Sequence, residues 1–466
     1  MPLPLDNRPS RSTIATALSE LAALFGNRLV TSDAVRAQHA NVTTWSADGI
    51  PDGVIFPQSV DDVQSAMRVC ARHRMPVIPF GAGSSLEGHL NAPLGGISFD
   101  MKDLNEIIAV HAEDADCVVE PGVTRSQLNE YLRDQGLFFP IDPGADAHLG
   151  GMASTRASGT TAVRYGTMKD VVLAMKVVLP SGELLTTSRR ARKSSAGYDL
   201  TRLFVGSEGT LGVITELTLR LYPIPESIAG GVCRFPTINS ACDAAIMGIQ
   251  SGIPLARVEL VDEQQIAICN VYSKLNLPEQ PTLFIEFHGS AASVQEQSER
   301  FADIVSEFGG SPFEWSSKPE DRTRLWKARH DMFWADKAYR PNSQVVVTDV
   351  CVPIARLAEC VIETQKDIRE SRLIAPLFGH VGDGNFHTVV SVMMEDPDEV
   401  ARAKAFVSRL SERALAMEGT CTGEHGVGDG KRKYLVDELG EPAVNLMRAI
   451  KKAVDPLNIM NPGKIV

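Results

Sequence analysis

Residues 142–166, DPGADAHLGGMASTRASGTTAVRYG, form the stretch of the chain that is richest in small side chains. A stretch of this composition is either a flexible loop or a backbone cradle for a large ligand. Strands predicted at 171–179 and 183–186 follow it without a linker-like composition, which favours the cradle. The stretch therefore predicts that the residues around it fold as a ligand-binding domain.

Two more glycine-rich segments have the same character. Gly81-Ala-Gly-Ser-Ser85 follows a strand predicted at 76–80, and its small residues would let backbone N–H groups approach a phosphate closely. Residues 206–213, GSEGTLGV, precede another predicted strand at 214–221. Leu86 stands where a dinucleotide-binding G-x-G-x-x-G motif requires glycine, so the first segment is not a Rossmann fingerprint.

The second half of the chain begins after Pro223 and Pro225. Its apolar patterns alternate between those of strands and those of helices, which predicts a second α+β domain. The strands are expected at 257–260, 282–288 and 344–352, and the helices at 238–251, 293–308, 354–369 and 396–417. A further helix is expected near 442–454, in the final segment of the chain. A length of 466 residues exceeds the size of a single core, in agreement with two domains.

Charge and composition exclude several classes of protein. The net charge is −12, from 46 Lys and Arg against 58 Asp and Glu, which argues against a nucleic-acid partner. The eight Cys are scattered without a paired spacing, as in proteins of a reducing compartment. No apolar run approaches the roughly 20 residues of a membrane span. Residues 12–25 indicate an amphipathic helix of the fold and no signal or transit peptide, so a cytoplasmic location is expected, with peripheral membrane attachment left open.

Residues 380–387, HVGDGNFH, place two histidines around a predicted tight turn. Apolar runs on both sides indicate strands, and Asp383-Gly384 is typical of a hairpin turn. With a four-residue loop, His380 lies directly opposite His387, and cross-strand neighbours of this kind have Cβ atoms about 4.5 to 5.5 Å apart. Two imidazoles at that separation can share one metal ion.

A second loop, Gly423-Glu-His-Gly-Val-Gly428, offers a third ligand. Glu424 would supply an anionic oxygen, and three protein ligands leave one coordination position open, as in catalytic sites. His425 would then face whatever the ion binds. The alternative, that His380, His387 and His425 are ordinary polar loop residues, stays open on these residues alone.

Eight motifs, taken in their order along the chain, resemble one family. They are PVIPFGAGSSLEG, VVEPGVTRSQLN, PIDPGADAHLGGMASTRASGTTAVRYGTMKD, LFVGSEGTLG, VVTDVCVP, GHVGDGNFH, GTCTGEHGVG and MNPGK. The series resembles flavoproteins of the vanillyl-alcohol-oxidase type with an FAD-linked oxidase C-terminal half, and among them the FAD-dependent D-lactate dehydrogenases of the cytochrome type. The resemblance runs nearly from end to end.

The resemblance implies an α+β fold in three parts. Residues 1–225 would form a PCMH-type FAD-binding domain of two α+β subdomains, and residues 226–420 a substrate or cap domain with an antiparallel sheet and flanking helices. Residues 421–466 would return to the first domain and complete the active site.

The resemblance also implies FAD as the cofactor. The flavin would be non-covalent, because Ser84 and Ser85 occupy the loop in which some relatives attach FAD through a histidine. The residues implied in FAD binding are Pro79, Gly81, Ala82, Gly83, Ser84, Ser85, Glu120, Pro121, Gly122, Pro143, Gly144, Gly150, Gly151, Ser154, Ser158, Gly159, Tyr165, Gly166, Glu208, Gly209, Gly212, Val213, Ile214 and Asn461.

The metal and the base follow from the same resemblance. A Zn²⁺ or Mn²⁺ ion would bind His380, His387 and Glu424, and a His/His/carboxylate set does not distinguish the two metals. His425 would be the catalytic base.

The resemblance further implies how a substrate would bind. Arg329 would hold the substrate carboxylate by two parallel hydrogen bonds. Val347 and Val389 stand where hydroxyglutarate-oxidising relatives place a Lys and an Asn. A second acid group would meet an apolar wall there, so a substrate with a short or apolar side chain is expected.

The implied reaction is oxidation of D-lactate, or a similar short D-2-hydroxy acid, to the 2-oxo acid by hydride transfer to flavin N5. The electrons would pass to cytochrome c, a quinone or an electron-transfer flavoprotein, and a homodimer stays open. The first alternative is the FAD subunit of a glycolate dehydrogenase or oxidase. A D-2-hydroxyglutarate dehydrogenase is less favoured, and a non-redox FAD synthase of the same fold is the most remote.

Overall fold

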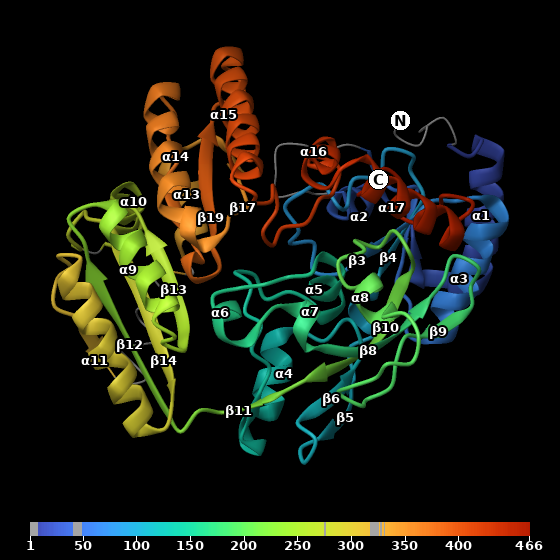
Figure 1. Cartoon of the computed structure of the whole chain (residues 1–466). Helices are drawn as coiled ribbons and strands as arrows, with labels where there is room; N and C mark the ends of the chain where they lie inside the picture. The colour runs from blue at the N-terminus through green and yellow to red at the C-terminus, as the bar shows by residue number, and fades with distance from the viewer. Residues whose placement is uncertain (1–7, 41–48, 275, 317–325, 327–328, 330) are drawn as a thin grey trace. The chain divides into compact units, whose positions relative to one another are not determined.

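The computed structural model describes residues 8–40, 49–274, 276–316, 326, 329 and 331–466 (Figure 1). The chain forms two compact units. Unit 1 comprises Met1–Ser158, Thr167–Ile224 and Glu424–Val466, and unit 2 comprises Gly159–Gly166 and Pro225–Gly423. The short segment 159–166, which the sequence analysis assigns to the first domain, therefore packs with unit 2.

The first sheet of unit 1 has four strands in the order β1-β2-β4-β3. Strands β2, β4 and β3 are parallel, and β1 pairs with β2 in the antiparallel sense. The strands are β1 (Leu29–Val30), β2 (Gly53–Ile55), β3 (Val77–Phe80) and β4 (Ile97–Asp100). Helices α1 (Arg11–Phe25) and α3 (Val60–His73) pack on this sheet, because their apolar stripes join the strand residues in one buried core.

The second sheet of unit 1 has five antiparallel strands in the order β5-β6-β10-β8-β9. They are β5 (Ile107–His111), β6 (Asp116–Val119), β8 (Val172–Val178), β9 (Leu184–Thr186) and β10 (Val213–Arg220). Helices α4 (Arg125–Leu132) and α5 (Leu149–Thr155) contribute to its core. Helix α4 begins with a complete capping box, in which Thr124 and Gln127 each accept from the other's backbone N–H.

The C-terminal segment is built into unit 1. After helix α17 (Glu441–Val454), Met460 pairs with Val77 beside the first sheet. The Lys451 ammonium is buried and donates to Asp455 Oδ2 at 2.6 Å and to the carbonyl oxygens of Thr210 and Met460 at 2.8 and 2.7 Å. Burial lowers the pKa of Lys451, and the Asp455 carboxylate opposes that shift. One buried cation thus fixes three segments of unit 1 together.

Unit 2 is built on one eight-stranded sheet in which every pair is antiparallel. The order is β15-β12-β14-β13-β18-β19-β16, with β17 also paired to β19. The strands are β12 (Ser227–Arg234), β13 (Leu255–Val261), β14 (Thr282–Gly289), β15 (Glu314–Ser316), β16 (Gln344–Val347), β17 (Val350–Cys351), β18 (Leu377–Gly379) and β19 (Asn385–Val392).

The helices of unit 2 pack around this sheet (Figure 1). They are α6 (Ala162–Tyr165), α9 (Ile238–Gln250), α10 (Glu263–Ser273), α11 (Ala291–Glu307), α13 (Met332–Tyr339), α14 (Leu357–Ser371) and α15 (Pro397–Ala416). Helix α6, from the segment 159–166, packs against β13. Among the described residues no helix is both long and apolar enough to cross a membrane.

The α+β class and the antiparallel second sheet expected from the sequence are confirmed. The expected strand 344–352 is wrong in detail, because it divides into β16 and β17 at Thr348 and Asp349. Strand β12 was not predicted, since Gly230 and Gly231 weaken its apolar alternation.

The buried cation near the C-terminus yields a stability prediction. Lys451→Ala leaves the Asp455 carboxylate buried without its partner, so we expect a loss of about 3 to 5 kcal/mol in the free energy of unfolding. Urea denaturation measures this loss. Lys452→Ala, at the exposed neighbouring position of the same helix, is the matched control and should change stability by no more than about 0.5 kcal/mol. Equal stability of the two variants would contradict the anchoring role of Lys451.

Candidate active site

The hairpin that carries the two histidines has a different register from the one predicted. Phe378 pairs with His387, and His380 lies beyond the end of β18 in a turn that contains the 3-10 helix Val381–Asp383. The prediction that His380 lies directly opposite His387 is therefore wrong. The slip is two residues, which preserves the face of the sheet, and the imidazole centroids still lie 5.4 Å apart.

Glycines at close backbone contacts account for this register. A Cβ on Gly379 would lie 2.4 Å from Phe386 Cα, so only glycine allows β18 to pair this closely with β19. Gly384 closes the turn at φ +79°, and a Cβ there would lie 2.1 Å from the Val352 carbonyl oxygen. The turn is thereby held against the residue that follows β17.

The protein fixes the tautomer of both imidazoles. His380 Nδ1 lies 2.6 Å from Glu259 Oε1, and His387 Nδ1 lies 3.0 Å from the Thr348 carbonyl oxygen. Because a carbonyl and an ionised carboxylate only accept hydrogen bonds, each Nδ1 carries the proton. In the neutral rings Nε2 then remains as the atom with a lone pair for a metal ion.

Glu424 completes a group that could hold a cation. It follows Gly423, the last residue of unit 2, and ligand atoms of His380, His387 and Glu424 lie within 4.8 Å of one another. Position 423 has room only for glycine, since a Cβ there would lie 2.1 Å from Asn385 Nδ2. Nitrogen and oxygen donors in a His/His/carboxylate set suit Zn²⁺ and Mn²⁺.

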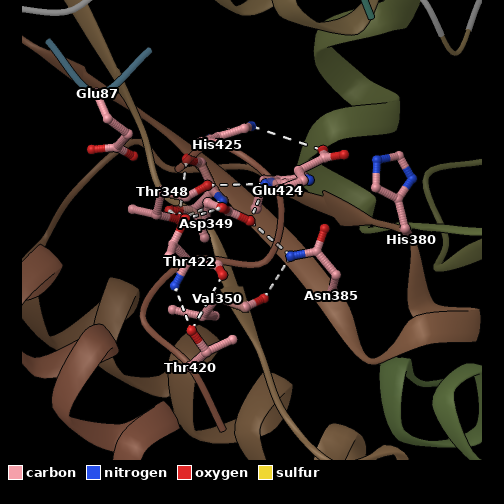
Figure 2. Close-up of polar contacts among 12 residues, drawn as sticks. Glu87, Thr348, Asp349, Val350, His380, Asn385, Thr420, Thr422, Glu424 and His425 are labelled. Atoms are coloured by element: carbon pink, nitrogen blue, oxygen red, sulfur yellow. Dashed lines mark hydrogen bonds and ion pairs between the residues drawn. The ribbon is translucent and has the colours of Figure 1, made fainter. Parts of the chain in front are cut away.

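The described residues contain a second such group, made of Asp349, His387 and His425, with the same limit of 4.8 Å. Figure 2 shows Asp349 beside Asn385 and Thr422. Asp349 is buried and accepts from Asn385 Nδ2 at 2.8 Å and from Thr422 Oγ1 at 3.1 Å. Asp349 was not among the residues predicted for the site, although its position in the run of apolar residues VVTDVCVP was an available signal.

Arg329 is buried in unit 2 and held by two neighbours. Its Nε and Nη2 donate to Glu259 Oε2 at 3.0 and 2.6 Å, and its guanidinium lies 4.7 Å from the centroid of the Phe378 ring. Burial alone would raise the pKa of Glu259, but His380 and Arg329 outweigh it and lower this pKa to about 2. Sequence reasoning missed Glu259, which no motif marks.

The two valines expected at the substrate pocket are cross-strand neighbours. Val347 on β16 pairs directly with Val389 on β19, and both belong to the apolar cluster that includes Phe378. Val389 is fully buried, while Val347 is half-buried. Neither valine side chain can donate a hydrogen bond to a second carboxylate of a substrate.

The glycines expected to bind FAD divide into two kinds in unit 1. Some pack against protein: a Cβ would lie 2.5 Å from Pro121 at Gly150, 2.4 Å from the Met101 carbonyl oxygen at Gly122, and 2.9 Å from Pro79 at Gly209. A Cβ on Gly144 or Gly151 would meet no described atom within 4 Å. The first kind shapes the cradle, and the second leaves backbone accessible to a ligand.

His148, which was not predicted to bind FAD, lies beside this open backbone. It precedes α5, and its Nδ1 lies 3.6 Å from the position of a Cβ on Gly81. That nitrogen is buried and has no hydrogen-bond partner among the residues the structure describes, and burial lowers the His148 pKa. An unpaired buried nitrogen beside open glycines fits a polar ligand such as FAD.

Glu208 and Asn461, both expected at the FAD site, fix loops of unit 1. Glu208 accepts from the N–H groups of Val427 and Gly428 at 2.7 and 2.8 Å, and its carboxylate lies 3.1 Å from His89 Nε2. Burial would raise its pKa, but His89 and the two N–H groups lower it. Asn461 donates to the carbonyl oxygens of His89 and Glu208.

The remaining residues of the expected cradle lie in both units. Gly159, Tyr165 and Gly166 belong to unit 2, where the Tyr165 hydroxyl lies 2.7 Å from His288 Nδ1. The others belong to unit 1: Ala82, Gly83, Ser84, Ser85, Glu120, Pro143, Ser154, Ser158, Gly212, Val213 and Ile214.

Comparison with protein families assigns the class. Residues 51–188 match the FAD binding domain, and residues 224–465 match the C-terminal domain of FAD linked oxidases. The solved structure of 4-ethylphenol oxidase from Gulosibacter chungangensis superimposes with a TM-score of 0.81 over 98% of each chain at 19% identity, which shows a shared fold. The chain is thus a flavoprotein of the PCMH type with an FAD-linked oxidase C-terminal domain.

Curated relatives narrow the class to a family. The chain is 48% identical over 98% of its length to the probable mitochondrial D-lactate dehydrogenase of Danio rerio, covering 92% of that protein. It is 46% identical over 96% of its length to the mitochondrial cytochrome-type D-lactate dehydrogenase of Arabidopsis thaliana, covering 80% of it. A glycolate oxidase subunit of Bacillus subtilis is 32% identical over 93% of both chains. The chain belongs to the family of FAD-dependent D-lactate dehydrogenases.

Two neighbouring glycines provide a test of the cradle. Gly151→Ala should leave the fold intact, because the position is open, but should weaken FAD binding about tenfold or more by placing a methyl group against the ligand. Gly150→Ala should instead cost about 1 to 3 kcal/mol of stability, because its Cβ would overlap Pro121. Urea denaturation and titration of the apoprotein with FAD measure the two effects. Full FAD affinity in Gly151→Ala would exclude this backbone from the flavin site.

Proposed function

We propose that the chain oxidises D-lactate, or a D-2-hydroxy acid of similar size, to the 2-oxo acid, with non-covalent FAD as the first electron acceptor. The observation that carries this proposal is the grouping of His380, His387 and Glu424 within 4.8 Å. Two imidazoles with protonated Nδ1 and one carboxylate suit a cation that binds a hydroxy acid. Membership in the family supports the same substrate class.

His380, His387 and Glu424 would hold a divalent ion, Zn²⁺ or Mn²⁺. Such an ion, when bound, would polarise the hydroxyl group and lower its pKa. The residues contribute the geometry, since the two Nδ1 hydrogen bonds prevent either imidazole from turning about its Cβ–Cγ bond.

His425 is proposed to take the hydroxyl proton. Its imidazole lies in the group with Asp349 and His387, and its Nε2 is 3.8 Å from Glu424 Oε1. A base next to a carboxylate can accept a proton as the Cα hydrogen leaves with its electron pair. FAD, when bound, would supply the acceptor for the hydride, and with the proton taken by His425 this would balance the oxidation of a secondary alcohol to a ketone.

Arg329 is proposed to bind the substrate carboxylate. Nε and Nη2 are engaged by Glu259, and Nη1 makes no hydrogen bond to the residues that the structure describes, so this edge of the guanidinium can still donate. Val347 and Val389 provide no partner for a second acid group, which favours lactate over 2-hydroxyglutarate. Glycolate is the second candidate, because the glycolate oxidase subunit is among the relatives.

We further infer that the electrons leave to a cytochrome. Support comes from the plant relative, whose name specifies a cytochrome-type dehydrogenase. That relative and the fish relative are both named mitochondrial, which does not match the cytoplasmic location expected from the sequence.

The role of the base can be measured directly. His425→Ala should lower the rate of flavin reduction by D-lactate by about 10²- to 10⁴-fold, while FAD stays bound. Stopped-flow absorbance under anaerobic conditions measures this rate. His111→Ala, a change in β5 of unit 1, is the control and should reduce the flavin at the wild-type rate. A wild-type rate in His425→Ala would exclude the residue as the base.

Removal of the metal tests whether D-lactate oxidation requires a divalent ion. Treatment with a chelator should abolish D-lactate oxidation without releasing FAD, and added Mn²⁺ or Zn²⁺ should restore it. Metal content by atomic emission and flavin absorbance are followed on the same samples. Full activity in protein that contains no divalent metal would contradict the proposed site.

A further inference from the structure

Glu259 lies on β13 and has no exposed surface. Its nearest neighbours on this face of the sheet are apolar, namely Val261 on the same strand and Phe284 as its cross-strand partner, and the Arg257–Glu286 ion pair lies one position further along. A carboxylate in such a place is costly unless each of its oxygens is paired. The groups that pair with the two oxygens therefore determine whether the carboxylate can stay ionised there.

The two oxygens of Glu259 have different partners. Oε1 lies 2.6 Å from His380 Nδ1, and Oε2 accepts two hydrogen bonds from Arg329, at 3.0 Å from Nε and 2.6 Å from Nη2. One partner is a proposed metal ligand, and the other is the proposed anchor of the substrate carboxylate. A single rigid group therefore connects the two.

We propose that Glu259 is a positioning residue that sets the His380 imidazole and the Arg329 guanidinium at a fixed separation, so that metal and substrate carboxylate are oriented by one carboxylate. This inference rests on the proposed function and extends it. Glu259 does not touch substrate; it acts through His380 and Arg329.

The arrangement explains why a carboxylate is needed. The His380 Nδ1–H and both Arg329 groups are donors, so the bridging group must accept on both atoms. A glutamine of the same shape can accept on one atom only, because its amide nitrogen donates. Phe378 also holds the guanidinium in place, since Arg329 lies over its ring. Phe378 is itself fixed relative to Glu259, because its strand β18 pairs with β13.

Glu286 offers a matched control on the neighbouring strand. It is buried on β14, where its Oε1 lies 2.7 Å from His288 Nε2 and its Oε2 accepts from Trp326 Nε1 at 2.6 Å. It contacts neither of the proposed metal-ligand histidines. Glu286→Gln thus disturbs a comparable buried carboxylate without touching His380 or Arg329.

The test uses the FAD-loaded full chain and two readouts other than turnover. Mn²⁺ affinity is measured by electron paramagnetic resonance of the free ion, and pyruvate affinity at saturating Mn²⁺ by the change in flavin absorbance. Glu259→Gln should weaken Mn²⁺ binding about 10- to 100-fold and pyruvate binding about tenfold. Glu286→Gln should leave both affinities at wild-type values.

The outcomes separate this inference from the proposed function. If the wild-type chain binds no Mn²⁺, the proposed metal site fails and the inference fails with it. If the wild-type chain binds Mn²⁺ and Glu259→Gln binds it equally well, only the inference is overturned. Should Glu259→Gln not fold, the double variant Glu259→Gln/Arg329→Met removes the unpaired guanidinium, and wild-type Mn²⁺ affinity in that variant would also overturn the inference.

Discussion

Strand β19 is the element on which the histidine side of the site depends. All eight of its residues are buried, and it pairs with β16, β17 and β18. Asn385, His387 and Val389 are consequently fixed by pairing with β17, β18 and β16, respectively. A site on a central strand is more precisely placed than one on loops alone. The glycines at 379, 384 and 423 then allow the neighbouring segments to approach β19 closely enough for their side chains to reach the same point.

Buried carboxylates provide the second constraint. Glu259, Asp349, Glu208 and Asp455 are each buried, and each accepts from two or more donors. The donors to Glu259 and Asp349 lie on separate segments, whereas Glu208 accepts from the adjacent Val427 and Gly428, and Asp455 from residues of the stretch 451–460. Removal of any one donor leaves a charge that the protein cannot hydrate. The result is that loops which carry no regular secondary structure, among them 420–428 and 458–461, are held in one conformation.

The sequence predicted the class of the fold and the residues of the candidate ligand group, because both depend on local signals: apolar periodicity, glycine-rich turns and histidines around a turn. It could not predict the register of the hairpin, since a slip of two residues keeps the same side chains on the same face and differs only in tertiary contacts at Gly379 and Gly384. Glu259 and His148 were missed for a related reason. Glu259 stands in no motif and acts through His380 and Arg329, which lie far away in the sequence. His148 stands in the glycine-rich motif, but its buried nitrogen, unpaired among the described residues, is evident only in the structure.

The glycine-rich stretch shows a similar limit. Composition marked all of 142–166 as one cradle, but the structure divides it, with 159–166 packed in unit 2 and Gly150 against Pro121. Small residues permit close packing against protein as readily as against a ligand. Only the surroundings of each Cβ distinguish the open positions, Gly144 and Gly151, from the packed ones.

The most direct test of the proposed function is the visible spectrum of the purified FAD-loaded chain under anaerobic conditions, with D-lactate, L-lactate, glycolate and D-2-hydroxyglutarate added separately. The proposed function predicts rapid loss of the flavin band with D-lactate, and slow or no loss with L-lactate and D-2-hydroxyglutarate. A flavin that stays oxidised with D-lactate but is reduced by glycolate or D-2-hydroxyglutarate would contradict the proposed substrate, and one that none of the four acids reduces would contradict the hydroxy-acid dehydrogenase itself.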